Sequence, residues 1–96
     1  MMMLIKKIEV CGRKFSIVKH MNHYCAVEDK YIGADGRLTK AMNGIELGAS
    51  HSLDACEEHL RNRISMENLM ADGLSWAEAF SKVTGLPLEV CEKLNA

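Results

Sequence analysis

The sequence predicts an α+β fold in one domain spanning residues 1–96, with a small antiparallel sheet first and helices after it. Three observations support this fold class. The first half consists of short apolar runs separated by glycine and asparagine, which is typical of strands joined by tight turns. After Ser50 the apolar residues recur at intervals of three and four, the spacing of one helix face, which predicts one long helix. Gly73 and Gly85 divide the remainder into short segments, which predicts a C-terminal helical hairpin.

Three runs predict the first strands of a β-meander, and we expect three to five strands in all. Residues 3–10, 14–19 and 24–29 place their side chains alternately on two faces, as strands do. Asn43-Gly44 is a strong hairpin signal between two short runs, so a further hairpin is expected there. Because the long helix covers one face of so small a sheet, we expect the other face to be exposed and available for binding.

Residues 52–72 predict the long helix, with Ser52 as its cap. Ser75 and Glu78 have the spacing of a capping box at the start of a second helix. Pro87 suits the first turn of a last helix. The apolar stripes expected to face inward are Leu53, Cys56, Leu60, Ile64, Met66, Leu69 and Met70 on the long helix, and Trp76, Phe80, Val83, Leu86, Val90, Cys91 and Leu94 on the short ones.

The charge balance argues against a general polyanion binder, because 12 Lys and Arg residues stand against 13 Asp and Glu residues. The charges are unevenly distributed. Residues 1–49 carry eight basic and five acidic side chains, and residues 50–96 carry four and eight. This dipolar distribution suits a partner protein with a charged patch, or self-association as a homodimer.

The apolar N-terminal run does not have the pattern of a signal peptide, because Lys6 and Lys7 interrupt it and no small-residue cleavage site follows. No stretch approaches the ~18 apolar residues of a membrane span. We therefore expect a cytosolic protein that does not contact a membrane. Its four cysteines are expected to be thiols rather than disulfides.

Cysteine and histidine residues suggest a metal site that their spacing does not support. His20, His23 and Cys25 are close in sequence, and Cys56 and His59 share a helix face at positions i and i+3. Together they could supply the four ligands of zinc. The CxxC pairs of zinc fingers are missing, however, and Cys56 lies in the apolar stripe. We therefore expect no metal, and in particular no stoichiometric zinc, and no other cofactor.

No catalytic motif is present: the chain contains no GxSxG, no P-loop and no GxGxxG. Glu28-Asp29 and Glu57-Glu58 are adjacent carboxylates, whose side chains point apart on a strand or a helix. We interpret them as solvated charges rather than as acid/base pairs. The sequence thus predicts no catalytic residues and no enzymatic activity.

The last two helices have the layout of a helix-turn-helix, with Gly85 in the turn. The helix that would read DNA offers Glu89 and Glu92 against Lys93, and carboxylates oppose binding to phosphate. A nucleic-acid-binding accessory protein, using this segment or the basic sheet, is therefore the alternative function. Because the acidic C-terminal helices should repel the DNA backbone, we expect no more than weak, strongly salt-dependent DNA binding.

A protein-binding surface is the leading interpretation. Tyr24 and Tyr31 flank the third expected strand, and Arg37 and Lys40 follow closely. Tyrosine and arginine are the residue types that anchor protein interfaces. We therefore predict that Tyr24, Tyr31, Arg37 and Lys40 bind a partner protein from the exposed side of the sheet and its loops.

The segments KYIGADGRLTKAMNGIELGASHSLDACEEHL and GLSWAEAF resemble small proteins of bacterial phages and integrated mobile elements. The order of strands followed by a helix is also similar to several anti-CRISPR and other anti-defence inhibitors. One departure is charge, because many such inhibitors mimic DNA with a strongly acidic surface and this chain is near neutral. The resemblance implies a small inhibitor that occludes a host protein and has no catalytic residues.

Overall fold

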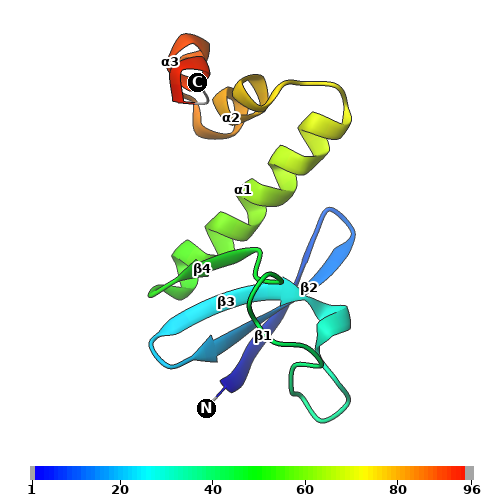
Figure 1. Ribbon diagram of the computed structural model, residues 1–96. Coiled ribbons are helices and arrows are strands. Elements are labelled where there is room, and N and C mark those ends of the chain that lie inside the picture. Colours follow the sequence, from blue (N-terminus) through cyan, green and yellow to red (C-terminus); the bar gives the residue numbers. More distant parts are fainter. Residues whose placement is uncertain (1, 95–96) are drawn as a thin grey trace. The chain divides into compact units, whose positions relative to one another are not determined.

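The computed structural model describes residues 2–94 and confirms the α+β fold: a four-stranded antiparallel sheet, a long helix packed with it, and two short C-terminal helices (Figure 1). The strands lie in the order β1 (Met2–Val10), β2 (Arg13–His20), β3 (His23–Glu28) and β4 (Gly48–Ser50). The helices are the 3-10 turn η1 (Asp29–Tyr31), α1 (Leu53–Ala71), α2 (Trp76–Thr84) and α3 (Leu88–Leu94). The chain divides into two compact units, of which the first ends at Arg61 and the second begins at Asn62.

Two-residue turns connect the first three strands. Cys11 and Gly12 join β1 to β2 with φ angles of 52° and 78°, and positive φ at both positions is what a type I′ hairpin turn requires. Met21 and Asn22 join β2 to β3, and Met21 has a positive φ of 56°. The register of the three expected strands is thus set by very short turns.

The hairpin expected at Asn43-Gly44 is wrong. The two residues do lie in a turn, in which Gly44 has a φ of 91°. The chain that follows pairs elsewhere, because the Leu47 N–H donates to the Ala26 carbonyl on β3 at 2.7 Å. The dipeptide reverses the chain locally, but β3 provides the partner that the next strand needs.

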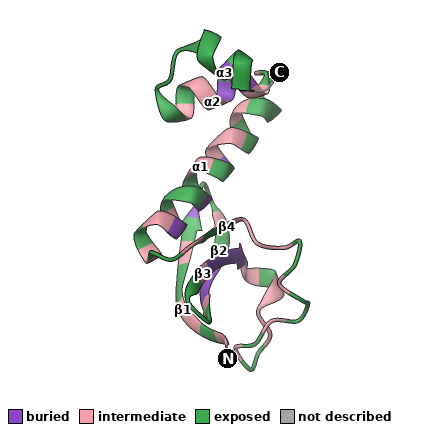
Figure 2. Ribbon diagram, turned by 60° about the vertical axis from the view of Figure 1, so that its left-hand side comes forward, coloured by how far each residue is buried: buried purple, intermediate pink, exposed green. Residues whose placement is uncertain are grey.

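The sheet is buried on both faces at its centre. Cross-strand partners share a face, so Ile17 and Ala26 lie on one face and Val18 and Cys25 on the other. Ile17, Val18 and Ala26 are fully buried, and Cys25 is 8% exposed. Figure 2 shows this buried core in purple on the central strands. The expected open face is therefore wrong at β2 and β3, because β2 carries apolar side chains on both faces and neither can be left in water.

The first turns of α1 lie directly against β4. Gly48 allows this approach, because a Cβ there would stand 3.2 Å from the Cys56 carbonyl oxygen and 3.2 Å from the Leu60 nitrogen. Cys56 and Leu60 are fully buried, as expected for the helix stripe. The Ala55 N–H donates to the Ser52 hydroxyl at 3.3 Å, which confirms Ser52 as the cap.

In the second unit, α2 begins and ends where its capping residues predict. The Ser75 hydroxyl accepts a hydrogen bond from the Glu78 N–H at 3.2 Å, and the Glu78 carboxylate accepts one from the Ser75 N–H at 2.9 Å. The capping box is therefore complete. Gly85 ends the helix in the left-handed conformation, with a φ of 78°. Trp76 and Phe80 stack with ring centroids 4.7 Å apart.

The inward stripe expected on the last helix is wrong except at one position. Cys91 is fully buried, whereas Leu86, Val90 and Leu94 are 40%, 41% and 61% exposed. On α1, Met70 is also 44% exposed. A helix of seven residues makes only two turns, so it can turn few side chains toward the helices of its own unit.

We predict that Gly48→Ala destabilises the protein by about 1–3 kcal/mol, the usual cost of an extra methyl group at a packed site. The new Cβ would press on backbone atoms of α1, which cannot move independently. Denaturation followed by circular dichroism measures the change. As a control, Ala49→Ser at the next, exposed position of β4 should change stability by less than ~0.5 kcal/mol. Equal stability of the Gly48→Ala variant and the parent would show that α1 and β4 are not held this closely.

Candidate functional site

The four residues predicted to bind a partner do not form one cluster. Tyr24 lies beside the β2–β3 turn, and Tyr31 lies in η1 beyond the other end of β3. At ~3.3 Å per residue, the strand between them spans about 13 Å. Tyr24 has a cation of its own, because the Lys19 ammonium lies 5.4 Å from its ring centroid. Tyr31, Arg37 and Lys40 share the segment that connects β3 to β4.

Tyr31 is the centre of a loop rich in cations. The ammonium groups of Lys30 and Lys40 lie 5.2 and 5.5 Å from its ring centroid, within range of a cation–π interaction. The Tyr31 carbonyl accepts a hydrogen bond from the Thr39 N–H at 2.8 Å, which closes the loop between them. Arg37 is held through its backbone N–H and its side chain is exposed. We refer to Tyr31, Arg37 and Lys40 as the tyrosine loop.

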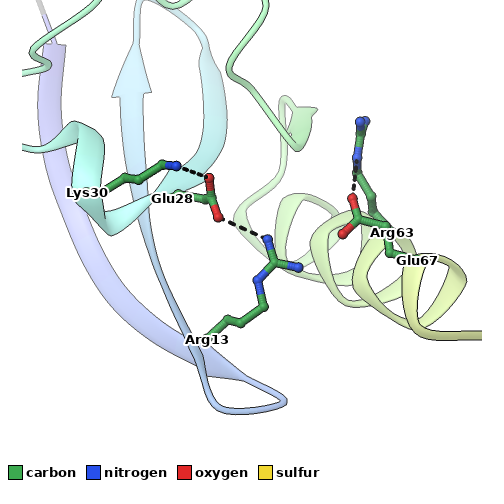
Figure 3. Close-up of polar contacts among 5 residues, drawn as sticks. All are labelled: Arg13, Glu28, Lys30, Arg63 and Glu67. Atoms are coloured by element: carbon green, nitrogen blue, oxygen red, sulfur yellow. Dashed lines mark hydrogen bonds and ion pairs between the residues drawn. The ribbon is translucent and has the colours of Figure 1, made fainter. Parts of the chain in front are cut away.

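Glu28, at the end of β3, ties this loop to the sheet. Its carboxylate accepts a hydrogen bond from Arg13 on β2 at 3.0 Å and pairs with Lys30 at 3.4 Å (Figure 3). The hydrogen bond from Arg13 is the main cause that lowers the pKa of Glu28. The interpretation of this residue as a solvated charge missed its role as an anchor.

Asp29 is held from the neighbouring strands in a similar way. Its Oδ1 accepts a hydrogen bond from the Ser16 hydroxyl at 2.7 Å and pairs with the Lys7 ammonium at 3.0 Å. The bond from Ser16, followed by that from Lys7, lowers the pKa of Asp29. The bond also satisfies Ser16, whose side chain is fully buried. Because the pKa of this carboxyl is lowered, it is a poor general acid at neutral pH.

A surface hollow of about 350 Å³ lies beside this network, lined by Lys7, Ile8, Glu9, Lys14, Phe15 and Asp29. Its two lysines are matched by two carboxylates, so the lining has no excess charge that would select an anion. These six side chains also include no histidine, cysteine or hydroxyl that could act as a base or nucleophile. Glu9 and Asp29 are the carboxylates of this lining.

The second unit carries an apolar surface that sequence reasoning missed. It consists of Leu86, Leu88, Val90 and Leu94, which are 40%, 44%, 41% and 61% exposed. We refer to these four residues as the apolar C-terminal surface. A signal for it was present, because the segment from Leu86 to Leu94 contains more large apolar side chains than a two-turn helix can bury.

Hydrogen bonds fix the turn that presents this surface. The Ser81 hydroxyl donates to the Leu86 carbonyl at 2.6 Å, and the Leu86 N–H donates to the Thr84 hydroxyl at 3.2 Å. The Thr84 hydroxyl itself donates to the Phe80 carbonyl at 2.7 Å. The surface is therefore partly preorganised, which lowers the entropy cost of binding. A hollow of about 350 Å³ adjoins Leu88 and is also lined by Leu74, Glu78, Ser81 and Lys82.

The polar side chains beside this surface are mainly acidic. Glu89 and Glu92 are exposed on α3, where Lys93 is the cation. α2 and α3 do follow each other across residues 85–87, as in a helix-turn-helix. The helix that would enter the groove, however, presents leucine, valine and carboxylate side chains, which are poorly suited to contact phosphates.

The structure does not assemble the zinc ligands considered from sequence. The buried Cys56 thiol donates to the Gly48 carbonyl at 3.7 Å, and the His59 ring bonds the Ala49 carbonyl at 3.3 Å. Within residues 2–94, no three His, Cys, Asp or Glu side chains form a group that could hold a metal ion. His23 instead contacts a histidine that sequence spacing did not single out.

Comparisons with models of known protein families, with curated proteins and with solved structures gave no match. In the part of the chain that the structure describes, none of the helices is both long and apolar enough to span a lipid bilayer.

We predict that Ser16→Ala raises the pKa of Asp29 toward its ordinary value of 3.8, because the largest cause of the lowered pKa is removed. A carboxyl whose pKa is lowered by folding stabilises the fold above its unfolded pKa, and that stabilisation disappears as pH falls through the folded value. The variant should therefore lose stability at neutral pH and show a weaker dependence of stability on pH in the acid range. Titration of the Asp29 side chain by NMR measures the pKa. Ser65→Ala on α1 is the control, and an Asp29 pKa identical in the two variants would contradict the assignment.

Proposed function

We propose that this chain is a small cytosolic protein-binding module, without catalytic activity, that acts by occluding a surface of its partner. The observation that carries the proposal is the apolar C-terminal surface, whose four large side chains are 40–61% exposed within nine residues. Single exposed apolar residues are normal, whereas contiguous apolar patches mark interaction sites, and these four residues are close together in the chain. The resemblance to small phage and mobile-element inhibitors agrees with a host protein as the partner.

The chemistry of the surface favours a protein partner with an apolar patch edged by cations. In the second unit, five carboxylates stand against three cations from residue 62 to residue 94. Glu89 and Glu92 lie on the same helix as three of the apolar side chains. A second copy of the chain would bring the same carboxylates toward one another if it paired through this surface. Charge complementarity therefore favours a different, basic-edged protein over a homodimer.

The tyrosine loop is a second contact surface within the same function. It combines one half-buried aromatic ring with exposed Arg37 and Lys40, a composition common among interface anchors. Its cations suit an acidic patch, which is the opposite of what the apolar C-terminal surface suits. Tyr24 lies at the other end of β3 and so is not part of this surface.

We predict that Leu88→Ser combined with Leu94→Ser weakens partner binding at least tenfold, or about 1.4 kcal/mol. Both side chains are exposed, so the melting temperature should change little. The partner is first recovered from a host extract with the parent chain, identified, and purified. Its dissociation constant is then measured by calorimetry for each variant.

Two further variants make this test decisive. Met3→Ser replaces an apolar side chain that is 59% exposed on β1 and should leave binding unchanged. Tyr31→Ala combined with Arg37→Ala tests the tyrosine loop. If that double variant loses binding and the leucine variant does not, the contact lies on the loop. A parent chain that dimerises through these leucines would identify a second copy as their occupant and exclude the basic-edged partner.

Nucleic-acid binding is the alternative function, and the structure supplies one observation against it. Lys6, Lys7, Arg13 and Lys30 pair with carboxylates, so part of the basic surplus of the first half is already neutralised. We predict no submicromolar affinity for any DNA duplex at physiological salt, where specific complexes typically reach ~10⁻⁸ M or tighter. Fluorescence anisotropy over a salt series measures it. A tight complex would make nucleic acid the leading function.

A further inference from the structure

β1 is an edge strand of the sheet. The strand order is β1-β2-β3-β4, so β2 pairs with β1 on one side, and residues 2–94 supply no strand on the other side. This edge is nine residues long, whereas β4 at the opposite edge has three. A long row of unpaired backbone N–H and C=O groups is a template for pairing with another strand. The free side of β1 is therefore a place where a second chain can add to the sheet.

The regular part of this edge is the segment Lys6–Val10. The register between β1 and β2 shifts just before Lys6, so a β-bulge separates this segment from the start of the strand. Bulges and lysines are devices that keep strand edges from pairing. Both lysines of this segment already have carboxylate partners, however: Lys6 pairs with Glu57 on α1, and Lys7 pairs with Asp29 at 3.0 Å. Their charge is thus partly neutralised, and it opposes a second strand less than free lysines would.

The β1–β2 turn decides which backbone groups of this segment face outward. A two-residue turn of this type is closed by a hydrogen bond between the residues that flank it, here Val10 and Arg13. Hydrogen-bonded and non-hydrogen-bonded pairs then alternate along the antiparallel ladder. The backbone groups of Ile8 are therefore directed toward β2, whereas those of Lys7 and Glu9 are directed toward the free side.

The charges of the segment are self-complementary in one register. Two copies of β1 that pair antiparallel about a two-fold axis at Ile8 place Lys7 of each copy opposite Glu9 of the other. Each of these pairs would exchange two backbone hydrogen bonds, because both residues direct their backbone groups outward. An axis at Lys6, Lys7 or Glu9 would instead place like charges opposite each other, which destabilises strand pairing.

We propose that the segment Lys6–Val10 binds a second copy of the chain, paired antiparallel about Ile8 so that one sheet continues across both copies. Ile8 is half-buried, and on the axis it would meet its own copy in a non-hydrogen-bonded pair, where side chains come closest. The Lys7 ammonium has three donors, so it can keep Asp29 and also bind Glu9 of the other copy. This pairing is independent of the apolar C-terminal surface, where charge disfavours a second copy.

Sedimentation equilibrium of the full chain over a concentration series tests the pairing. The chain carries Cys11→Ser, so that the exposed Cys11 thiol cannot link two copies. A reversible monomer–dimer equilibrium is expected. Glu9→Lys should weaken the dimer about fivefold or more, because it places lysines opposite each other in both pairs. Glu58→Lys makes the same change of charge at an exposed position of α1 and should leave the dimer unchanged.

An exchange of charge between two chains separates pairing from folding. Lys7→Glu should also weaken the dimer, and an equimolar mixture of the Lys7→Glu and Glu9→Lys chains should restore it. In the mixed pair, two lysines of one chain lie opposite two glutamates of the other. Lys7→Glu also removes the ion pair with Asp29, so circular dichroism checks the fold of each variant. A damaged fold would not recover on mixing, whereas a charge-matched interface would.

A disulfide at the axis tests the register. Ile8→Cys in the Cys11→Ser chain should give a disulfide-linked dimer under mild oxidation, because the two Cβ atoms would lie about 4.5 Å apart. Met3→Cys is the control. Met3 is 59% exposed, more than the half-buried Ile8, but in this register its two copies would lie about 30 Å apart.

The proposal is overturned if the parent chain stays monomeric up to about 1 mM, since the pairing would then be negligible. It is also overturned if mixing the two charge variants restores no dimer, or if Met3→Cys forms the disulfide as readily as Ile8→Cys. Loss of the dimer in the variant with Leu88→Ser and Leu94→Ser would overturn it too, because association would then use the apolar C-terminal surface.

Discussion

At Gly48 the backbone of β4 meets the first turns of α1, and the packing of helix on sheet in the first unit depends on that contact. β4 contains three residues, Gly48, Ala49 and Ser50, and all three pair with β3. A side chain at Gly48 would meet backbone atoms of α1 at 3.2 Å. The close approach lets Cys56 and Leu60 reach the core, where both are fully buried. It also fixes where the long connection from β3 must end.

The burial of both sheet faces decides where a partner can bind. β2 contributes four consecutive buried residues, so its surface is not available to another molecule. The proposed partner would instead meet the edge strand β1, the loops, the ends of strands or the second unit. The ion pairs of Glu28 and Asp29 lie at one such end and hold η1 to β1 and β2. The ion pairs of Glu28 and Asp29 thus support the start of the tyrosine loop, and a backbone hydrogen bond between Thr39 and Tyr31 closes it.

Local signals in the sequence were sufficient for most of the fold. The first three strands, Ser52, the capping box and Gly85 all act within a few residues, and the structure has each of them where the sequence indicates. The errors concern choices made over long distances. Asn43-Gly44 turns the chain, but the strand partner is Ala26, seventeen residues earlier. Side-chain periodicity placed an apolar stripe on α3, but it could not show that this stripe has little to pack against.

The candidate surfaces show the same difference between groupings that are local in sequence and contacts made over long distances. Tyr31, Arg37 and Lys40 are close in sequence, and the structure keeps them in one segment. Tyr24 is also close in sequence, but the length of β3 separates it from Tyr31. The contact between His23 and His51 joins residues 28 positions apart, and strand order alone creates it. No spacing rule applied to one stretch of chain could have indicated that pair.

The four cysteine thiols differ in exposure, and this difference makes one of them selectively reactive. Burial, which raises the pKa of Cys56 to about 11, keeps that thiol protonated and unreactive at neutral pH. Cys25 and Cys91 are buried as well, whereas Cys11 is exposed in the β1–β2 turn. Alkylating reagents should therefore attach a dye or a surface tether at this turn without mutagenesis. In a meander this turn is at the opposite end of β2 from the β2–β3 turn, so a tether there leaves the β2–β3 turn facing solution.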